Sequence, residues 1–379
     1  MRKILETREP EERAILVGVE IRGRGNSWSL EDSLEELSQL AKTAGAEVVG
    51  VVSQKLSSPT ASFLIGRGKL EEIKELKKRT GANLVIFDDE LSPAQQRNLE
   101  REIGAKVIDR TILILDIFAK RAKTREGKIQ VELAQHQYLL PRLMGMWPHL
   151  ERLGGGIGTR GPGESQIETD RRLIMRRIQR LKEELEGIRK HRSLYRKRRT
   201  KEGIPVLSLI GYTNAGKSTL LNTITKSRVD VEDKLFSTLD PTTRRINLPS
   251  GRRVLITDTV GFIQKLPPIL VAAFRATLEE LEEATLLLHV VDITHPRAYL
   301  QGEVVEGILR DLGLIEKPRI LIINKVDKLG DEGIIDELYE KEGYRGDVVF
   351  ISAEKGWGIG RLLEVIDRRI EEISEGYVH

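Results

Sequence analysis

The chain of 379 residues contains no cysteine, which excludes disulfides, cysteine-bound metal centres, iron–sulfur clusters and thiol nucleophiles. Its six histidines show no metal-ligand spacing such as H-E-x-x-H. The longest apolar stretches fall well short of the roughly 18 residues that a membrane span needs. The first residues lack the apolar segment of a signal peptide. We therefore expect a cytoplasmic protein without a membrane span.

Excess charge of one sign is also small. The 62 Lys and Arg against 58 Asp and Glu give a net charge of +4, which excludes a uniformly basic nucleic-acid coat but permits a local basic patch. A composition of 39% hydrophobic and 32% charged residues is typical of globular proteins. The length allows two or three domains of roughly 150 residues each.

Residues 1–110 are predicted to form an N-terminal α/β domain, because short β-branched runs alternate with amphipathic helical stretches and so favour a parallel sheet. The expected strands are 15–21, 48–52, 63–65, 84–87 and 106–108, and the expected helices are 30–42, 69–79 and 93–103. Asp88 and Asp89 end a strand, where α/β sheets often carry sites, although helix caps also use such residues. The Gly-Arg-Gly sequence at 66–68 is interpreted as a turn.

Residues 111–200 are predicted to form a long helical hairpin. Helical patterns run from 111 to 153, with interruptions near Pro141 and Pro148. The stretch 154–166 contains six glycines and a proline, and we expect a non-helical connector there. Apolar residues then follow heptad spacing at 167, 174, 178, 181, 185 and 188. This spacing predicts a helix of roughly 30 residues whose seam pairs either within the chain or between chains. The short connector between the two helices favours pairing within the chain, so we expect a monomer.

The end of this second helix is strongly basic, with eight cations among residues 189–201. One or two cations would complement the helix dipole, but eight exceed that need. We expect an anionic polymer as partner, nucleic acid first, with a membrane surface as the lesser alternative. The residues predicted to contact nucleic acid are Arg189, Lys190, Arg192, Arg196, Lys197, Arg198 and Arg199.

Residues 201–379 begin with an apolar strand that runs into a phosphate-binding loop and then a helical pattern, satisfying G-x-x-x-x-G-K-[ST] in its required context. Backbone amides of such a loop surround phosphates at a helix N-terminus. Lys217 is predicted to reach the β- and γ-phosphates, and Ser218 to ligate Mg²⁺. The predicted nucleotide-binding residues of the loop are Gly211, Tyr212, Thr213, Asn214, Ala215, Gly216, Lys217, Ser218 and Thr219.

A second motif, Asp258-Thr259-Val260-Gly261, follows another apolar strand forty residues later. Asp258 can hold Mg²⁺, usually through water, and the Gly261 amide can meet the γ-phosphate. The pattern Asp-x-x-Gly is common by itself. Its position after a phosphate loop, at the end of a strand, makes it a strong indication of a nucleoside triphosphate site.

The last two motifs predict recognition of guanine. Asn324, Lys325 and Asp327 follow an apolar strand, and the Asp327 carboxylate can accept from both N1–H and the 2-amino group of guanine. Adenine offers no such donors and would leave a buried charge unpaired. Ser352, Ala353 and Glu354 follow the final strand, where the Ala353 amide is predicted to bind guanine O6. Four motifs in this order predict a site for GTP or GDP in a mainly parallel sheet with flanking helices.

With these motifs the chain resembles the translation-factor-related P-loop GTPases and, within them, the HflX family. The resemblance extends beyond the nucleotide motifs to the segments 126–135, 160–172, 235–246 and 266–280, and covers about residues 15–370. It implies a protein that binds the large ribosomal subunit, with an N-terminal α/β domain and a helical hairpin joined to a GTPase domain. We expect the basic end of the hairpin to contact the ribosomal RNA. The resemblance also implies that ribosomes are split or rescued under stress.

The resemblance also implies roles for single residues. Thr238 matches the switch threonine that closes on Mg²⁺ and γ-phosphate, with Thr242 and Thr243 as close alternatives. The expected catalytic residues are Lys217, Thr238 and Gly261. The expected metal ligands are Ser218, Thr238 and Asp258. Asn214 either helps to bind K⁺ or only shapes the loop. Many small GTPases carry a water-orienting Gln where this chain has Phe262, so we expect slow hydrolysis until a partner orders the site.

Two alternative functions remain open from the sequence. The chain would be a GTP-sensing binding module that sequesters ribosomal subunits, with hydrolysis incidental, or a GTPase that assists RNA modification or ribosome maturation. The hairpin and the basic run are compatible with the second alternative, whereas the sequence of the glycine-rich connector argues against it.

Overall fold

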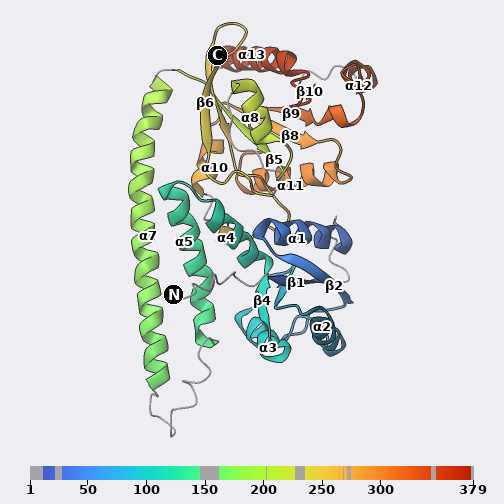
Figure 1. Cartoon of the computed structure of the whole chain (residues 1–379). Helices are drawn as coiled ribbons and strands as arrows, with labels where there is room; N and C mark the ends of the chain where they lie inside the picture. Colours follow the sequence, from blue (N-terminus) through green and yellow to red (C-terminus); the bar gives the residue numbers. More distant parts are fainter. Residues whose placement is uncertain are drawn as a thin grey trace, which may run out of the picture. The chain divides into compact units, whose positions relative to one another are not determined.

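The computed structural model describes residues 12–21, 28–145, 162–201, 203–226, 235–267, 269–270, 275–342 and 347–376. The chain divides into two compact units: residues 1–120 with 135–179, and residues 121–134 with 180–379. Figure 1 shows the elements of both. No helix in the described ranges combines the length and apolar character needed to cross a membrane.

The first unit contains a four-stranded parallel sheet in the order β2-β1-β3-β4, which confirms the predicted parallel sheet. Its strands are β1 (Arg13–Ile21), β2 (Glu47–Leu56), β3 (Leu84–Phe87) and β4 (Lys106–Asp109), and its helices are α1 (Leu30–Ala44), α2 (Arg67–Thr80), α3 (Pro93–Ile103) and α4 (Arg110–Arg121). Local sequence explains the helix ends. In α3, Ser92 and Gln95 form a reciprocal capping box, and Gly104 ends the helix in the left-handed conformation.

Two local predictions in this unit were wrong. Residues 63–65 do not form a strand, although Leu64 and Ile65 are buried; the segment is a loop in which Thr60 pairs with Leu64. A run of three apolar residues fits a buried loop as well as a strand. The Gly-Arg-Gly sequence at 66–68 is not a turn, because Gly66 is the N-cap of α2 and the helix begins at Arg67.

Buried ion pairs and hydrogen bonds hold the carboxyl ends of β3 and β4. Arg110 is 2% exposed and pairs with Glu36 and Asp88, each at 2.7 Å. The Ser33 hydroxyl also donates to Asp88, at 2.6 Å. Asp88 therefore has its charge fully engaged inside the unit, and this arrangement supports a structural role rather than a separate catalytic one.

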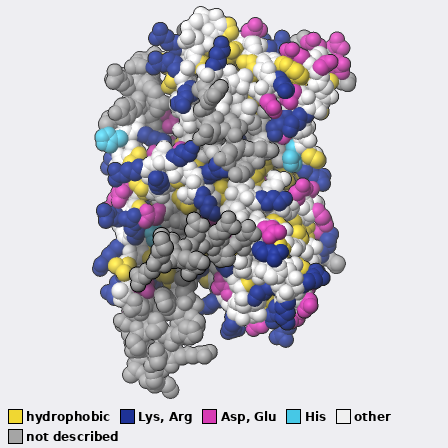
Figure 2. Space-filling view, in the orientation of Figure 1, with side chains coloured by type: hydrophobic (Ala, Val, Ile, Leu, Met, Phe, Trp, Pro, Cys, Tyr) yellow, Lys and Arg dark blue, Asp and Glu magenta, His cyan; other side chains and the backbone are white. Residues whose placement is uncertain are grey.

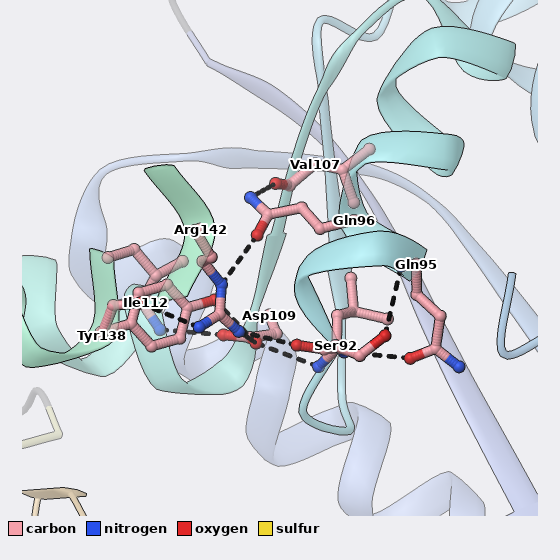
Figure 3. Close-up of polar contacts among 9 residues, drawn as sticks. Ser92, Gln95, Gln96, Val107, Asp109, Ile112, Tyr138 and Arg142 are labelled. Carbon is pink, nitrogen blue, oxygen red and sulfur yellow. Dashed lines mark hydrogen bonds and ion pairs between the residues drawn. The ribbon is translucent and has the colours of Figure 1, made fainter. Parts of the chain in front are cut away.

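Asp109 anchors the following helices to the sheet (Figure 3). Its carboxylate accepts from the backbone N–H of Ile112 at the start of α4 and from the hydroxyl of Tyr138, at 3.1 and 2.8 Å. Arg142 lies over the Tyr138 ring at 3.4 Å and donates to the Gln96 side chain at 3.0 Å. Burial, reinforced by the Asp109 charge, raises the pKa of Tyr138, so its hydroxyl remains a donor.

The second unit contains a six-stranded sheet in the order β10-β9-β8-β5-β7-β6, parallel except for the β6–β7 pair. The strands are β5 (Val206–Gly211), β6 (Thr242–Asn247), β7 (Arg253–Asp258), β8 (Leu286–Asp292), β9 (Arg319–Asn324) and β10 (Val348–Phe350). The helices are α8 (Lys217–Thr225), α10 (Arg275–Glu282), α11 (Ala298–Asp311), α12 (Ile334–Glu342) and α13 (Ile359–Gly376). Strands β5, β7, β8 and β9 bury their aliphatic side chains in its core, as expected for a parallel sheet with helices on its faces.

Helices α5 (Arg125–Leu139) and α7 (Pro162–Lys201) belong to the predicted hairpin, and each contributes residues to both units. A 3₁₀ helix follows α5 over Leu140–Gly145, as the interruption near Pro141 predicted. Helix α7 has 40 residues and begins at Pro162, so the prediction that 154–166 is wholly non-helical was wrong. Proline suits the first position of a helix, where its missing N–H costs nothing. Residues 154–161 lie outside the described ranges.

Candidate functional site

The predicted site residues gather at the carboxyl edge of the second sheet. The phosphate loop follows β5, Asp258 ends β7, Asn324 ends β9, and Ser352 lies just beyond β10. The residues that line the pocket at this edge are Thr213, Asn214, Gly216, Lys217, Ser218, Thr219, Phe236, Ser237, Thr238, Thr259 and Gly261. Parallel strands place such residues together because their carboxyl ends share one edge.

The phosphate loop is closed by contacts with its own backbone and with neighbouring strands. Lys217 is buried, and its ammonium donates to the carbonyls of Gly211 and Tyr212 at 3.1 and 2.8 Å. Burial lowers the pKa of Lys217 to about 8, against the opposing effect of Asp258. Gly216 has φ +96°, and the amide of Asn324 fills the space where a side chain would lie. The lysine and the helix N-terminus of α8 therefore offer positive potential to an anion.

Three side-chain oxygens converge beside this loop. The Ser218 hydroxyl donates to Asp258 Oδ2 at 2.6 Å, and Thr238 Oγ1 lies 2.8 Å from Ser218 Oγ and 3.0 Å from Asp258 Oδ2. The second oxygen, Asp258 Oδ1, is buried and has no hydrogen-bond partner among the described residues. Burial raises the pKa of Asp258, although Lys217 opposes the shift. A set of hard oxygen ligands with an unsatisfied buried carboxylate fits Mg²⁺.

The structure distinguishes the three threonines that the sequence left as rivals. Thr238 is the one whose hydroxyl meets Ser218 and Asp258. Thr243 is bound instead to the Thr257 hydroxyl at 2.9 Å, and Thr242 is paired with Asp258 through the β6–β7 register. This geometry favours Thr238 as the switch threonine, and that role stays a prediction.

The base-recognition loops are braced by one buried amide. Asn324 is 2% exposed, donates to the Ala215 carbonyl at 2.9 Å and accepts from the Ala353 N–H at 2.9 Å. It thereby joins the phosphate loop to the segment after β10. Because the Ala353 amide donates to Asn324 in this structure, its predicted contact with guanine O6 stays a prediction. Asp327 is partly exposed in the short 3₁₀ helix Val326–Lys328.

One residue that supports the base-recognition loop was not predicted from the sequence. Asp292, at the end of β8, forms an ion pair of 2.7 Å with Lys325. This contact holds the Lys325 side chain, whose backbone adopts φ +68°. The signal was available, because Asp292 is an acidic residue at the carboxyl end of an apolar strand, as Asp258 is.

Two residues with special predictions also have defined surroundings. Phe262 is buried, its backbone pairs with that of Gly211 and Thr213, and it is not among the residues that line the pocket. Asn214 has φ +63°, a conformation that asparagine tolerates better than most residues. This conformation fits a loop-shaping role, and the K⁺ contact stays a prediction.

Part of the basic run is engaged inside the second unit. Arg189 pairs with Glu279, and Arg192 pairs with Glu126 at 3.2 Å and with Glu280 at 3.8 Å. The side chains of Arg196, Lys197, Arg198 and Arg199 lie outside the described residues. On the face that Figure 2 shows, basic and acidic side chains of the described part are interspersed. The nucleic-acid contacts therefore stay predictions.

Comparison with known proteins agrees with this geometry. Three family models match: "GTP-binding GTPase N-terminal" over residues 31–119, "GTP-binding GTPase Middle Region" over 121–199, and "50S ribosome-binding GTPase" over 206–325. A GTPase HflX of Caldanaerobacter subterraneus subsp. tengcongensis is 52% identical over 98% of this chain and 83% of its own length. A GTPase HflX of Escherichia coli is 49% identical over 89% of this chain and 79% of its own.

A solved structure is similar to this chain over most of its length. The crystal structure of SsGBP in complex with GDP covers 96% of this chain and 99% of its own, with 29% identity and a TM-score of 0.51. The fold and the site together define a P-loop GTPase that binds GTP and GDP and hydrolyses GTP. More specifically, the chain belongs to the HflX family of GTPases.

Proposed function

We propose that this protein is a GTP-driven switch that associates with the large ribosomal subunit and splits or rescues ribosomes under stress. The observation that carries the switch is the meeting of Ser218, Thr238 and Asp258 within 3.0 Å. These residues come from three separate segments. A ligand at their common point therefore holds the Thr238 segment to the phosphate loop, and loss of that ligand releases it.

In this proposal Ser218, Thr238 and Asp258 hold Mg²⁺, directly or through water, and the metal supplies charge neutralisation for the phosphates. Lys217 binds the β- and γ-phosphates, and the Gly261 amide donates to the γ-phosphate. Phe262 cannot orient the attacking water, so unassisted turnover is slow and a partner accelerates it by ordering the segment of Thr238. The side chain of Asn214 helps to bind K⁺ beside the phosphates.

Association with the ribosome is supported by the matching family description and by the basic end of α7. Since Arg189 and Arg192 already neutralise acidic residues of α5 and α10, we assign RNA docking chiefly to Arg196, Lys197, Arg198 and Arg199. Each phosphate contact that is lost should reduce the slope of log binding constant against log salt concentration by about one.

Sedimentation of large ribosomal subunits with the protein bound to a GTP analogue or to GDP tests the association. The triple variant of Arg196, Arg198 and Arg199 to Ala should bind more weakly, with a flatter salt dependence. A matched variant with Arg244, Arg245 and Arg253 changed to Ala removes the same charge from exposed positions on β6 and β7. Equal weakening by both variants would leave only the overall charge as an explanation and would contradict docking by α7.

The catalytic part is tested by turnover with and without large subunits, in K⁺ and then in Na⁺. The proposal predicts slow turnover alone, acceleration by subunits, and a further dependence on K⁺. Fast and equal rates under all four conditions would contradict it. One round of ribosome splitting with a non-hydrolysable analogue would assign hydrolysis to resetting the switch, whereas sequestration without splitting would favour a binding module.

A further inference from the structure

The segment of Thr238 is attached at a second point, the N-terminus of α5. Asp240 lies two residues after Thr238, and its Oδ2 accepts from the backbone N–H groups of Lys123 and Thr124 at 2.8 and 2.9 Å. The Thr124 hydroxyl donates to its Oδ1 at 2.5 Å. All of these residues belong to the second unit. One carboxylate thus binds three donors that lie more than a hundred positions earlier in the chain.

This end of α5 is shaped to receive the carboxylate. Thr124 caps the helix, because its Oγ1 accepts from the Gly127 N–H at 3.0 Å. A negative charge is also favoured at a helix N-terminus. Asp240 Oδ1 occupies the space where a Gly127 side chain would lie. Glycine weakens a helix relative to alanine, so its presence here is explained by the close approach of Asp240.

Little chain separates the two attachments. Between Thr238 and Asp240 lies only Leu239, which is buried, and β6 begins at Thr242. With Thr238 bound to Ser218 and Asp258, and Asp240 bound to α5, movement of one end of this short link must move or strain the other. The nucleotide pocket and the start of α5 are therefore mechanically connected through a few bonds.

The start of α5 is in turn connected to the basic end of α7. Glu126, in the first turn of α5, pairs with Arg192 at 3.2 Å, and Arg192 also pairs with Glu280 of α10 at 3.8 Å. Glu126 lies two residues after Thr124, so the first turn of α5 carries both the contact with Asp240 and the ion pair with Arg192. A change at Asp240 therefore has a short route to Arg192 of α7, four residues before the first cation that we assign to RNA docking.

We propose that Asp240 is a positioning residue for GTP hydrolysis: it tethers the segment of Thr238 to the N-terminus of α5 and couples the state of the nucleotide to that helix. This inference rests on the proposed role of Thr238. GTP engages Thr238 and GDP does not, because only GTP carries a γ-phosphate. Linkage is reciprocal, so a tether that favours GTP must itself be tightened by GTP.

The first test uses the full chain with Asp240→Ala. Affinities for GDP and for a non-hydrolysable GTP analogue are measured by calorimetry with Mg²⁺. Coupling of this kind changes affinity roughly 5- to 150-fold. We expect at least a fivefold loss of affinity for the analogue, an affinity for GDP within about twofold of wild type, and slower single-turnover hydrolysis.

A matched control lies elsewhere in the same unit. The Asp367 carboxylate accepts from the N–H and the hydroxyl of Ser250, both at 2.8 Å, outside the nucleotide pocket. Asp367→Ala removes a similar set of hydrogen bonds and should leave the ratio of the two affinities unchanged. An equal change in both variants would reduce the effect of Asp240 to general destabilisation and would overturn the proposal.

The second test approaches the tether from the helix. Gly127→Ala favours the helical state of α5, yet its methyl group displaces Asp240. We expect the same loss of preference for the GTP analogue although the helix is retained. This variant also keeps the proposal falsifiable if Asp240→Ala fails to fold.

Amide hydrogen exchange supplies a readout that a merely structural contact would not move. The Lys123 and Thr124 amides should exchange more slowly with the GTP analogue than with GDP in the wild type, and equally in Asp240→Ala. Equal exchange in the wild type would overturn the tether. Thr238→Ala distinguishes failure of the proposed function from failure of the tether. If Thr238→Ala still prefers the GTP analogue over GDP, the proposed role of Thr238 is wrong. If Thr238→Ala loses this preference but Asp240→Ala keeps it, only the tether is rejected.

Discussion

Asn324 offers a quantitative test of how the nucleotide pocket is built. Its side chain is buried and makes one hydrogen bond to the phosphate loop and one to the segment after β10, both at 2.9 Å. Asn324→Ala removes both partners and leaves the Ala215 carbonyl and the Ala353 N–H buried without them. Each unsatisfied backbone group costs about 1–3 kcal/mol, so the expected loss of unfolding free energy is about 3 kcal/mol.

The assay follows urea unfolding of the second unit through the fluorescence of Trp357, with Trp28 and Trp147 replaced by Phe in every variant. The fluorescence signal then reports unfolding of the second unit without a contribution from the first. Affinity for GDP is measured in parallel, because loss of the brace frees both the phosphate loop and the segment that contains Ala353. We expect GDP affinity to fall by at least about tenfold, equivalent to about 1.4 kcal/mol.

Asn98→Ala is the matched control. Its amide makes one hydrogen bond, to the Ser62 carbonyl at 3.1 Å, in an exposed setting of the first unit. The change in unfolding free energy that Trp357 reports should stay below about 1 kcal/mol, because the contact belongs to the first unit and water replaces the missing partner. If Asn324→Ala cost no more than this control and left GDP affinity unchanged, the reasoning about the buried brace would be refuted.

Three further changes probe other parts of the molecule. Burial lowers the pKa of His289 to about 4, so between pH 7 and pH 5 this residue binds a proton in the unfolded state but not in the folded state. Over this pH range the wild type should lose about 2 kcal/mol more unfolding free energy than His289→Phe. Equal losses in urea titrations would contradict this. Arg110→Met strands two buried carboxylates and should cost about 3–5 kcal/mol, against less than about 1 kcal/mol for the exposed Arg13→Met; equal shifts in denaturation would reject the buried network. Phe262→Gln should cost about 3 kcal/mol without faster GTP turnover, because position 262 faces the core; an accelerated rate in a phosphate-release assay would show that the position reaches the attacking water.

Much of the fold followed from local pattern. Helix α3 was predicted with its exact bounds because Ser92, Pro93 and Gly104 mark its two ends chemically. The strands of the first sheet were located because apolar β-branched runs separate the helices. The segment 63–65 was mistaken for a strand because burial in a loop leaves the same apolar signature.

The nucleotide site was predictable because each motif combines residue type with a position after a strand. What the sequence does not show are contacts between distant segments. No proline or glycine marks the break between α4 and α5. At this break the Asp240 carboxylate accepts hydrogen bonds from the N–H groups of Lys123 and Thr124. Arg110 likewise reads as a surface cation, and only the folded unit shows it buried among carboxylates.

The internal pairing of Arg189 was missed for the same reason. A run of cations at a helix end looks uniformly exposed in sequence, whereas Glu279 lies far away in the chain. Charge pattern predicts the sign of a surface, and it does not tell which cations are already neutralised by acidic neighbours.

The most direct test of the central claim is calorimetric titration of the magnesium-containing protein with GTP and with ATP. A site that pairs the Asp327 carboxylate with two donors of guanine should favour GTP by roughly 10⁴-fold. Asp327→Asn should abolish that preference and admit xanthosine triphosphate, whose carbonyl accepts from the new amide. Equal affinity of the wild type for GTP and ATP, or an unchanged base preference in Asp327→Asn, would contradict the account.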